Sequence, residues 1–188
     1  MNKNRTVEIG ATPDTSAKEG YRFEMKANGS NTDELVFNKD TDNMKKKDNY
    51  QIEFILKNKG TKDEALRFSK EVQTVLWAKA VNDIKDQCPE SACHMPGVFY
   101  VDSTVAIEDE KLTVINTDPA VQLFKFAFNF LRPGQQDGPT TDYATYDPIG
   151  SNQNGGEEFS MANMEVIKFT ALGVGILAIA FVAYRVWW

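Results

Sequence analysis

The sequence has very few of the side chains on which most enzyme centres depend. Its 188 residues include one histidine and two cysteines. A single histidine excludes a multi-histidine metal centre, and two cysteines cannot form a four-thiolate zinc site. Any Ser-His or Cys-His catalysis would have to use His94. These shortages predict a protein that is not an enzyme and that needs no cofactor.

Positive charge is also scarce. The chain has 21 Lys and Arg residues against 27 Asp and Glu residues, which gives a formal net charge of −6. Nucleic-acid binding depends on clustered Lys and Arg that contact phosphates, so the acidic balance predicts no nucleic-acid partner. The length favours one domain with appendages over two domains.

Long apolar runs are missing from most of the chain, and stretch 1–14 does not form a secretory signal. The exception is 166–188, where no side chain is charged between Lys168 and Arg185. A helix of that length spans about 34 Å at ~1.5 Å per residue, which is enough to cross a bilayer core. We therefore expect one transmembrane helix in 161–188. Snorkelling cations and interfacial aromatic rings would sit at its ends, namely Lys168, Tyr184, Arg185, Trp187 and Trp188.

The position of this helix predicts a tail anchor. No hydrophobic signal precedes it, so the N-terminal domain is expected to stay in the cytoplasm, with a single pass through the membrane. The lipid bilayer is then the first expected partner.

Small residues lie on two opposed faces of the expected helix, at about 100° per residue. Small residues let transmembrane helices approach closely, which predicts a homo-oligomer that assembles through the helix. The alternative is that Ala and Gly are simply common in such helices. The residues are Ala171, Gly175 and Ala178 on one face, with Gly173 and Ala180 nearly opposite.

In the soluble part, apolar residues recur with a period of two, which is typical of strands that bury one face. The clearest rows are Tyr50, Ile52, Phe54 and Leu56, and then Phe124, Phe126, Phe128 and Phe130. Further strands are expected at 6–9, 21–25, 35–37, 66–68, 103–107 and 111–116. Turn residues at 108–110 and 118–119 predict successive antiparallel hairpins. The fold class expected for 1–131 is all-β, an immunoglobulin-like antiparallel β-sandwich, with a closed barrel as the alternative.

Two segments between these strands and the anchor are less regular. Segment 71–84 has apolar residues near helical spacing, which leaves a short helix and an irregular loop equally open. Segment 132–160 is rich in Gly, Pro and Asn and is expected to be a flexible linker without regular structure.

One cluster carries suggestive chemistry, the sequence from Cys88 to His94 that also contains Cys93. These three side chains are candidate metal ligands, although the chain offers no further Cys or His to complete a site. A redox-sensitive cysteine pair and a plain structural loop are the alternatives, and the structural loop is favoured. Segment 38–43 begins like a calcium loop but lacks the glycine and the bidentate glutamate, so a solvated loop is the better interpretation.

Several pieces of 50–156 resemble a group of small bacterial proteins that often carry the automatic label "nucleotide synthetase". They include Tyr146-Asp-Pro-Ile149, Leu112-Thr-Val-Ile-Asn116 and the loop from Cys88 to Cys93. The resemblance implies a β-rich fold and no secure biochemical activity. Proteins of this group end near the Tyr-Asp-Pro-Ile segment, whereas this chain continues into the expected anchor.

Three functions follow as hypotheses. The first is a non-enzymatic anchored protein whose sandwich binds or senses an unknown protein partner, including a version in which the helices form a pore as a membrane effector. The second is a structural protein of a lipid-containing phage. The third, which is disfavoured, is a small enzyme that uses Cys93 and His94.

Overall fold

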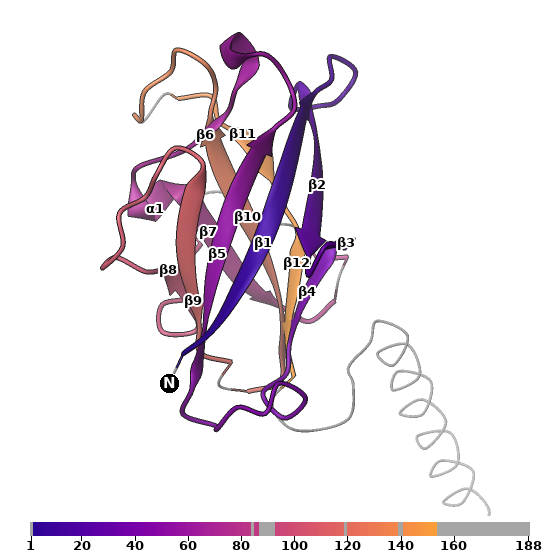
Figure 1. Ribbon diagram of the computed structural model, residues 1–188, viewed down its shortest axis with the longest axis vertical. Helices are drawn as coiled ribbons and strands as arrows, with labels where there is room; N and C mark the ends of the chain where they lie inside the picture. The colour runs from indigo at the N-terminus through magenta and orange to yellow at the C-terminus, as the bar shows by residue number, and fades with distance from the viewer. Residues whose placement is uncertain (1, 84, 87–92, 119, 139–140, 154–188) are drawn as a thin grey trace, which may run out of the picture. The chain divides into compact units, whose positions relative to one another are not determined.

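The computed structural model describes residues 2–83, 85–86, 93–118, 120–138 and 141–153. These residues form two β-sheets that pack face to face (Figure 1). The elements are β1 Asn2–Pro13, β2 Tyr21–Ala27, β3 Ser30–Asn31, β4 Glu34–Phe37, β5 Asn49–Asn58, η1 Lys62–Glu64, β6 Arg67–Phe68, α1 Val72–Val75, β7 Leu76–Val81, β8 Phe99–Val101, β9 Lys111–Asn116, β10 Gln122–Leu131, β11 Ala144–Tyr146 and β12 Ile149–Asn152.

The two sheets are mixed, and each contains one parallel pair. The first sheet has the order β3-β2-β1-β5-β9-β8, with β1 parallel to β5. The second has the order β11-β10-β12-β4, with β6 and β7 also on β10 and with β12 parallel to β4. The expected two-layer, mostly-β architecture is confirmed, but the expectation of purely antiparallel strands is wrong for these two pairs. Alternating burial shows which face of a strand meets the core and carries no information about strand direction.

The core lies between the sheets and is built from the two predicted aromatic rows. The predicted row on β5, from Tyr50 to Leu56 at alternate positions, and the four phenylalanines of β10 are all buried. Rings of the first sheet contact rings of the second, with centroids 4.6 Å apart for Phe54 and Phe128 and 4.9 Å apart for Phe99 and Phe124. Such aromatic pairs add about 0.5–1.5 kcal/mol each beyond the area that they bury.

The expected hairpins around β9 are wrong in detail. Segment 103–107 forms no strand, and the strands that pair with β9 are β5 and β8. The Asp102 carboxylate accepts hydrogen bonds from the Thr104 backbone N–H and hydroxyl at 3.0 and 2.6 Å, so local turn bonding competes successfully with extended structure. Strands β9 and β10 lie in different sheets, so residues 117–121 connect the two layers. Segment 71–84 contains both a four-residue helix, α1, and strand β7.

Two strands lie within the segment that the sequence predicts to be a linker. Strands β11 and β12 both pair with β10, so the expectation of a linker is wrong for residues 144–152. A Cβ on Gly150 would lie 2.4 Å from the Phe124 ring, which shows that this glycine permits close packing. Composition alone does not distinguish a glycine in a flexible linker from a glycine that leaves room for a packed aromatic ring.

The expected transmembrane helix at 161–188 and its named residues lie outside the described residues. Within the described ranges, no helix is both long enough and apolar enough to span a bilayer.

Candidate binding site at the open edge of β1

Strand β1 is longer than the strand beside it, which leaves part of one edge without a neighbour. Strand β5 pairs with Asn2–Ala11 of β1, whereas β2 pairs only with Val7–Pro13. No described strand lies on the β2 side of Asn2–Thr6, and we call this side the open edge. Strand β2 ends at Ala27 because the Asn28-Gly29 turn, with φ of 52° and 79°, sends the chain back into β3.

Alternate residues of β1 present their backbone groups to the open edge. The Ala11 carbonyl accepts a 2.9 Å hydrogen bond from Lys59, so Ala11 and the residues at alternate positions before it face β5. The Met25 carbonyl likewise accepts from Thr32 on the far side of β2, which agrees with this register. Asn4 and Thr6 therefore direct their N–H and C=O groups outward, and no described strand pairs with them there.

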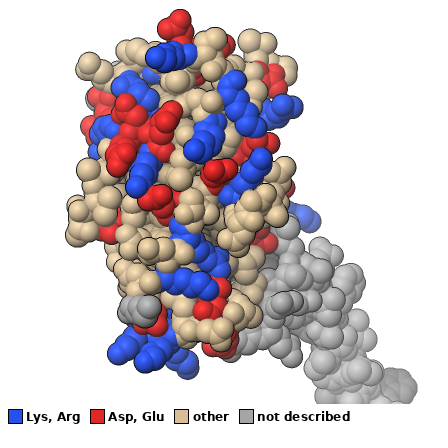
Figure 2. Space-filling model, in the orientation of Figure 1, with Lys and Arg blue, Asp and Glu red and all other residues tan. Residues whose placement is uncertain are grey.

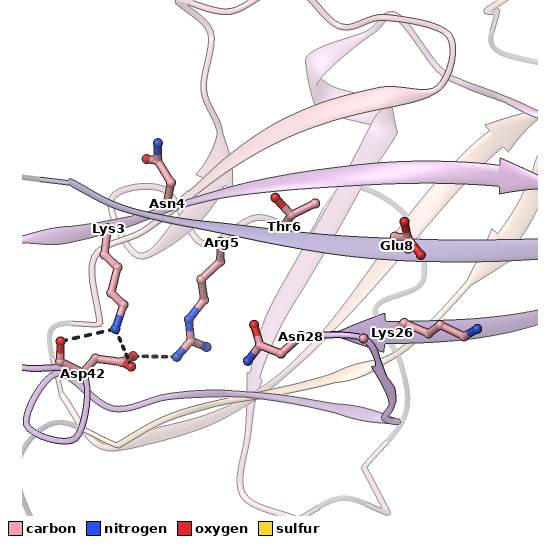
Figure 3. Close-up of a pocket in the computed structure, with 9 residues that line it drawn as sticks. Lys3, Asn4, Arg5, Thr6, Glu8, Lys26, Asn28 and Asp42 are labelled. Atoms are coloured by element: carbon pink, nitrogen blue, oxygen red, sulfur yellow. Dashed lines mark hydrogen bonds and ion pairs between the residues drawn. The ribbon is translucent and has the colours of Figure 1, made fainter.

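A cavity of about 500 Å³ occupies the place where a further strand would lie. Figure 3 shows it between β1 and the turn that ends β2, with Lys3 and Arg5 reaching from β1 toward Asp42. The lining residues are Lys3, Asn4, Arg5, Thr6, Glu8, Lys26, Asn28, Gly29 and Asp42.

Asp42 is the centre of the polar contacts in this cavity. Lys3 Nζ lies 2.6 Å from Asp42 Oδ1, and Arg5 Nη2 lies 2.5 Å from Asp42 Oδ2. The Tyr50 hydroxyl donates to the same Oδ2 at 2.7 Å. Burial raises the pKa of Asp42, but the hydrogen bonds from Lys3 and Tyr50 and the charges of Arg5 and Lys3 outweigh it and hold the pKa below 3.8. Asp42 is therefore ionised at neutral pH.

Arg5 links the two sheets at this end of the sandwich. Its guanidinium carbon lies 5.2 Å from the Phe37 ring centroid and 4.8 Å from that of Tyr50. Nη1 donates to the Val36 carbonyl of strand β4 at 2.6 Å. Cation–π contacts and the Asp42 pair hold this side chain over the end of the core.

The loop that carries Asp42, residues 38–48, is more ordered than the solvated loop that the sequence predicts. The Asn38 side chain accepts from the backbone N–H groups of Asp40 and Thr41 at 3.0 and 3.2 Å. Lys39 is 1% exposed, and its ammonium donates to the carbonyls of Lys46 and Thr117 at 2.9 and 2.5 Å. In this segment, which resembles the start of a calcium loop, the Asp42 carboxylate contacts the side-chain cations of Lys3 and Arg5.

A second carboxylate near this loop has an opposite environment. Asp118 is fully buried, and no described donor reaches either of its oxygens in hydrogen-bond geometry. Burial raises its pKa to about 6, and the charge and backbone N–H of Lys39 oppose this effect without outweighing it. Beside it, the Asn116 amide donates to the Asn152 side chain at 2.7 Å. The sequence gives no local sign of this buried group.

The predicted cysteine and histidine cluster does not assemble into a centre in the described part of the chain. Cys93 is a free, half-buried thiol whose carbonyl accepts a 2.8 Å bond from Ala78. His94 is exposed and lines a separate, largely apolar groove of about 640 Å³ beside Phe99 and Tyr100. Cys88 lies outside the described residues. Among those described, no group of three His, Cys, Asp or Glu residues is placed to hold a metal ion.

Sequence reasoning missed the open edge, although one local signal marked its limit. Asn-Gly is the strongest sequence signal of a two-residue hairpin turn. Here the turn ends β2 opposite Val7 of β1, whereas the pairing of β1 with β5 begins five residues earlier, at Asn2. The partners of Asp42 carry no such signal because Lys3 and Arg5 are 39 and 37 residues away along the chain.

Comparisons with known proteins add no family to this description. No protein-family model matches the chain, and a search of curated proteins finds no match.

Proposed function

We propose that the protein is a non-enzymatic, membrane-anchored binding protein. Its immunoglobulin-like sandwich captures an extended segment of a protein partner, which adds as a strand to the open edge of β1. The carrying observation is that Asn2–Thr6 pairs with β5 on one side and has no described strand on the other.

Strand addition uses the backbone groups that this edge leaves free. Asn4 and Thr6 together offer two N–H donors and two C=O acceptors at the spacing of an antiparallel ladder. Each main-chain hydrogen bond contributes about 0.5–1.5 kcal/mol net, so four contribute about 2–6 kcal/mol, and side-chain contacts must add to this because association itself costs several kcal/mol. The cavity beside them supplies the space for the incoming backbone.

The anchor and the assembly form the other half of the proposal. Segment 166–188 holds the domain on the cytoplasmic face of a bacterial inner membrane in a single pass. The small-residue faces, which include Gly173 and Gly175, support self-association of the helices. Partner capture by several sandwiches in one oligomer would raise the effective affinity.

The test of strand addition is whether binding depends on the partner's backbone. We would select ten-residue peptides from a random display library against the full chain in a non-ionic detergent. Each selected peptide would then be synthesised with single N-methyl groups along its length. We expect N-methylation to abolish binding at alternate positions only, because every second N–H of the added strand faces β1.

Two outcomes would contradict the proposal. One is a selection that yields no peptide binding, and the other is binding that is indifferent to the position of the N-methyl group. Thr6→Pro supplies a check from the protein side, because it removes one outward N–H from the open edge and leaves the β5 pairing intact. We expect this variant to bind the selected peptides more weakly while it keeps the unfolding midpoint of the parent within a few degrees.

A further inference from the structure

The two faces of β1 along the open edge differ in charge. Lys3 and Arg5 point inward and are half-buried, whereas Asn4 and Thr6 point outward and are exposed. On the outer face, Glu8 lies directly opposite Lys26 in the ladder, so these charges already balance across the strand pair. The charge that is not balanced lies on the inner face.

The inner-face cations have donor capacity to spare. The Lys3 ammonium has three N–H groups and uses two, both on Asp42. The Arg5 guanidinium has five N–H groups, and those that have a described acceptor bond Val36 and Asp42. Lys3 and Arg5 therefore share the negative charge of Asp42, and the charges of Arg5 and Lys39 also act on Asp118.

The surroundings extend this positive charge. The loop that carries Asp42 also carries Lys45, Lys46 and Lys47, and all three are exposed. Figure 2 shows Lys and Arg side chains gathered at the lower end of the domain, where Figure 1 places this loop and the start of β1. The aspartates of the same loop, at positions 40, 42 and 48, offset most of this charge, so the positive excess beside the open edge depends on Lys3 and Arg5.

We propose that the strand captured at the open edge carries carboxylates at two alternating positions, i and i+2, which face Lys3 and Arg5. This inference rests on the proposed strand addition. Alternate residues of an added strand project to the same face, and directly opposed residues of an antiparallel pair have Cβ atoms about 4.5–5.5 Å apart. An acidic segment of this pattern would place one carboxylate opposite each cation, while its intervening residues meet Asn4 and Thr6.

The experiment compares four synthetic ten-residue peptides with the full chain in non-ionic detergent. The background is threonine-rich, and two central positions carry Glu at i and i+2, Glu at i and i+1, Gln at i and i+2, or Lys at i and i+2. We expect the alternating Glu peptide to bind about tenfold more tightly than its Gln twin, because two opposed charge pairs act together. The advantage should shrink at high salt, and the Lys peptide should bind weakest.

Matched variants of the protein distinguish recognition by the inner-face cations from a non-specific attraction between acidic peptides and basic side chains. Lys3→Gln should reduce the preference for the alternating Glu peptide several-fold, whereas Lys57→Gln, at an exposed position of β5 outside the cavity lining, should leave it unchanged. An equal loss in both variants, or equal binding of the adjacent and alternating Glu peptides, would overturn the inference.

Failure of this inference is distinguishable from failure of strand addition. If the Gln peptide binds as well as the alternating Glu peptide and its binding still depends on N-methyl position, the strand is added without charge selection. If no peptide binds, the open edge is a protected edge in which Lys3 and Arg5 discourage pairing, and both proposals are wrong.

Discussion

Two aspartates near the loop 38–48 experience opposite surroundings. Asp42 accepts hydrogen bonds from Lys3, Arg5 and Tyr50, and its pKa lies below 3.8. Asp118 is buried with no described hydrogen-bond donor on its carboxylate, and its pKa rises to about 6. The same side chain thus organises a surface site in one place and opposes folding in the other. Burial has the same sign for both groups, so the difference comes from the number of donors and cations that reach each carboxylate.

The two groups also act on stability in different pH ranges. The contribution of Asp42 is fully present above its unfolded pKa, near 3.8, and is lost as the pH falls through its lower folded pKa. Asp118 has a raised folded pKa, so its favourable, protonated state is complete below 3.8 and is lost as the pH rises through about 6. The sum of these two contributions is therefore greatest near pH 3.8, where the contribution of Asp42 is nearly complete and the cost of ionising Asp118 is still small.

The largest effect is expected when Asp42 loses its charge. Asp42→Asn leaves Lys3 and Arg5 without their counterion and weakens three hydrogen bonds at once. We expect the free energy of unfolding at pH 7 to fall by about 3–4 kcal/mol, because the cations stay partly buried. Pulse proteolysis across a urea series measures this on the full chain in detergent micelles.

The control for that variant is Asp40→Asn in the same loop. Asp40 is exposed, and its backbone N–H, which the substitution keeps, makes its bond to Asn38. A change of less than about 0.5 kcal/mol is expected. Equal losses from both substitutions would show that the loop responds to any loss of charge and that Asp42 has no special place.

Replacing Asp118 should have the opposite sign. Asp118→Asn removes a carboxylate whose pKa moves from 3.8 to about 6 on folding, an interval worth at most about 3 kcal/mol. We expect the variant to be more stable than the parent by about 2–3 kcal/mol at pH 8 and equally stable at pH 4. The φ of 42° at this position suits asparagine as well as aspartate. A variant that gains nothing at pH 8 would show that Asp118 is solvated.

A substitution of Lys39 tests how far this one cation reduces the free-energy cost of burying the ionised Asp118 carboxylate. Its charge lowers the pKa of Asp118, so Lys39→Met should move the Asp118 transition above pH 6 and add about 1 kcal/mol of instability at pH 8. The measurement is the stability of the variant from pH 4 to 9. The double variant with Asp118→Asn is the control, because it should lose this pH dependence altogether.

The smallest effect is expected from removing one of the two cations beside Asp42. Lys3→Gln should raise the pKa of Asp42 toward 3.8, because it removes a hydrogen bond and a charge while Arg5 and Tyr50 stay. The Lys3 side chain is 39% exposed, so solvent screening limits the effect to about 0.5 kcal/mol. Carbon-detected NMR titration of the labelled aspartates measures it. Lys26→Gln should leave the Asp42 signal where it is.

The features of the fold that depend on neighbouring residues were predicted correctly, whereas most features that depend on distant residues were not. The alternation in 50–56 and 124–130 identified the core rows, because burial of every second side chain produces a pattern that is visible within a short stretch of sequence. Strand direction, the strand content of 144–152 and the failure of 103–107 to form a strand depended on contacts with distant segments or on local turn bonds. The glycines of the expected linker led to a wrong prediction for the same reason. Gly150 is needed to make room for the ring of Phe124, which lies 26 residues earlier in the sequence.

The sequence by itself determined a β-rich domain with two aromatic rows, an acidic chain with too few His and Cys residues for most metal centres, and an apolar C-terminal segment of membrane-spanning length. Only the tertiary structure decided that β1 extends beyond its pairing with β2 and that Lys3 and Arg5 form ion pairs with Asp42. It also decided that Asp118 is buried without a described donor on its carboxylate. The physical reason is range: periodicity and composition act between near neighbours, whereas an unpaired edge and a pKa depend on which distant residues the folded chain brings together.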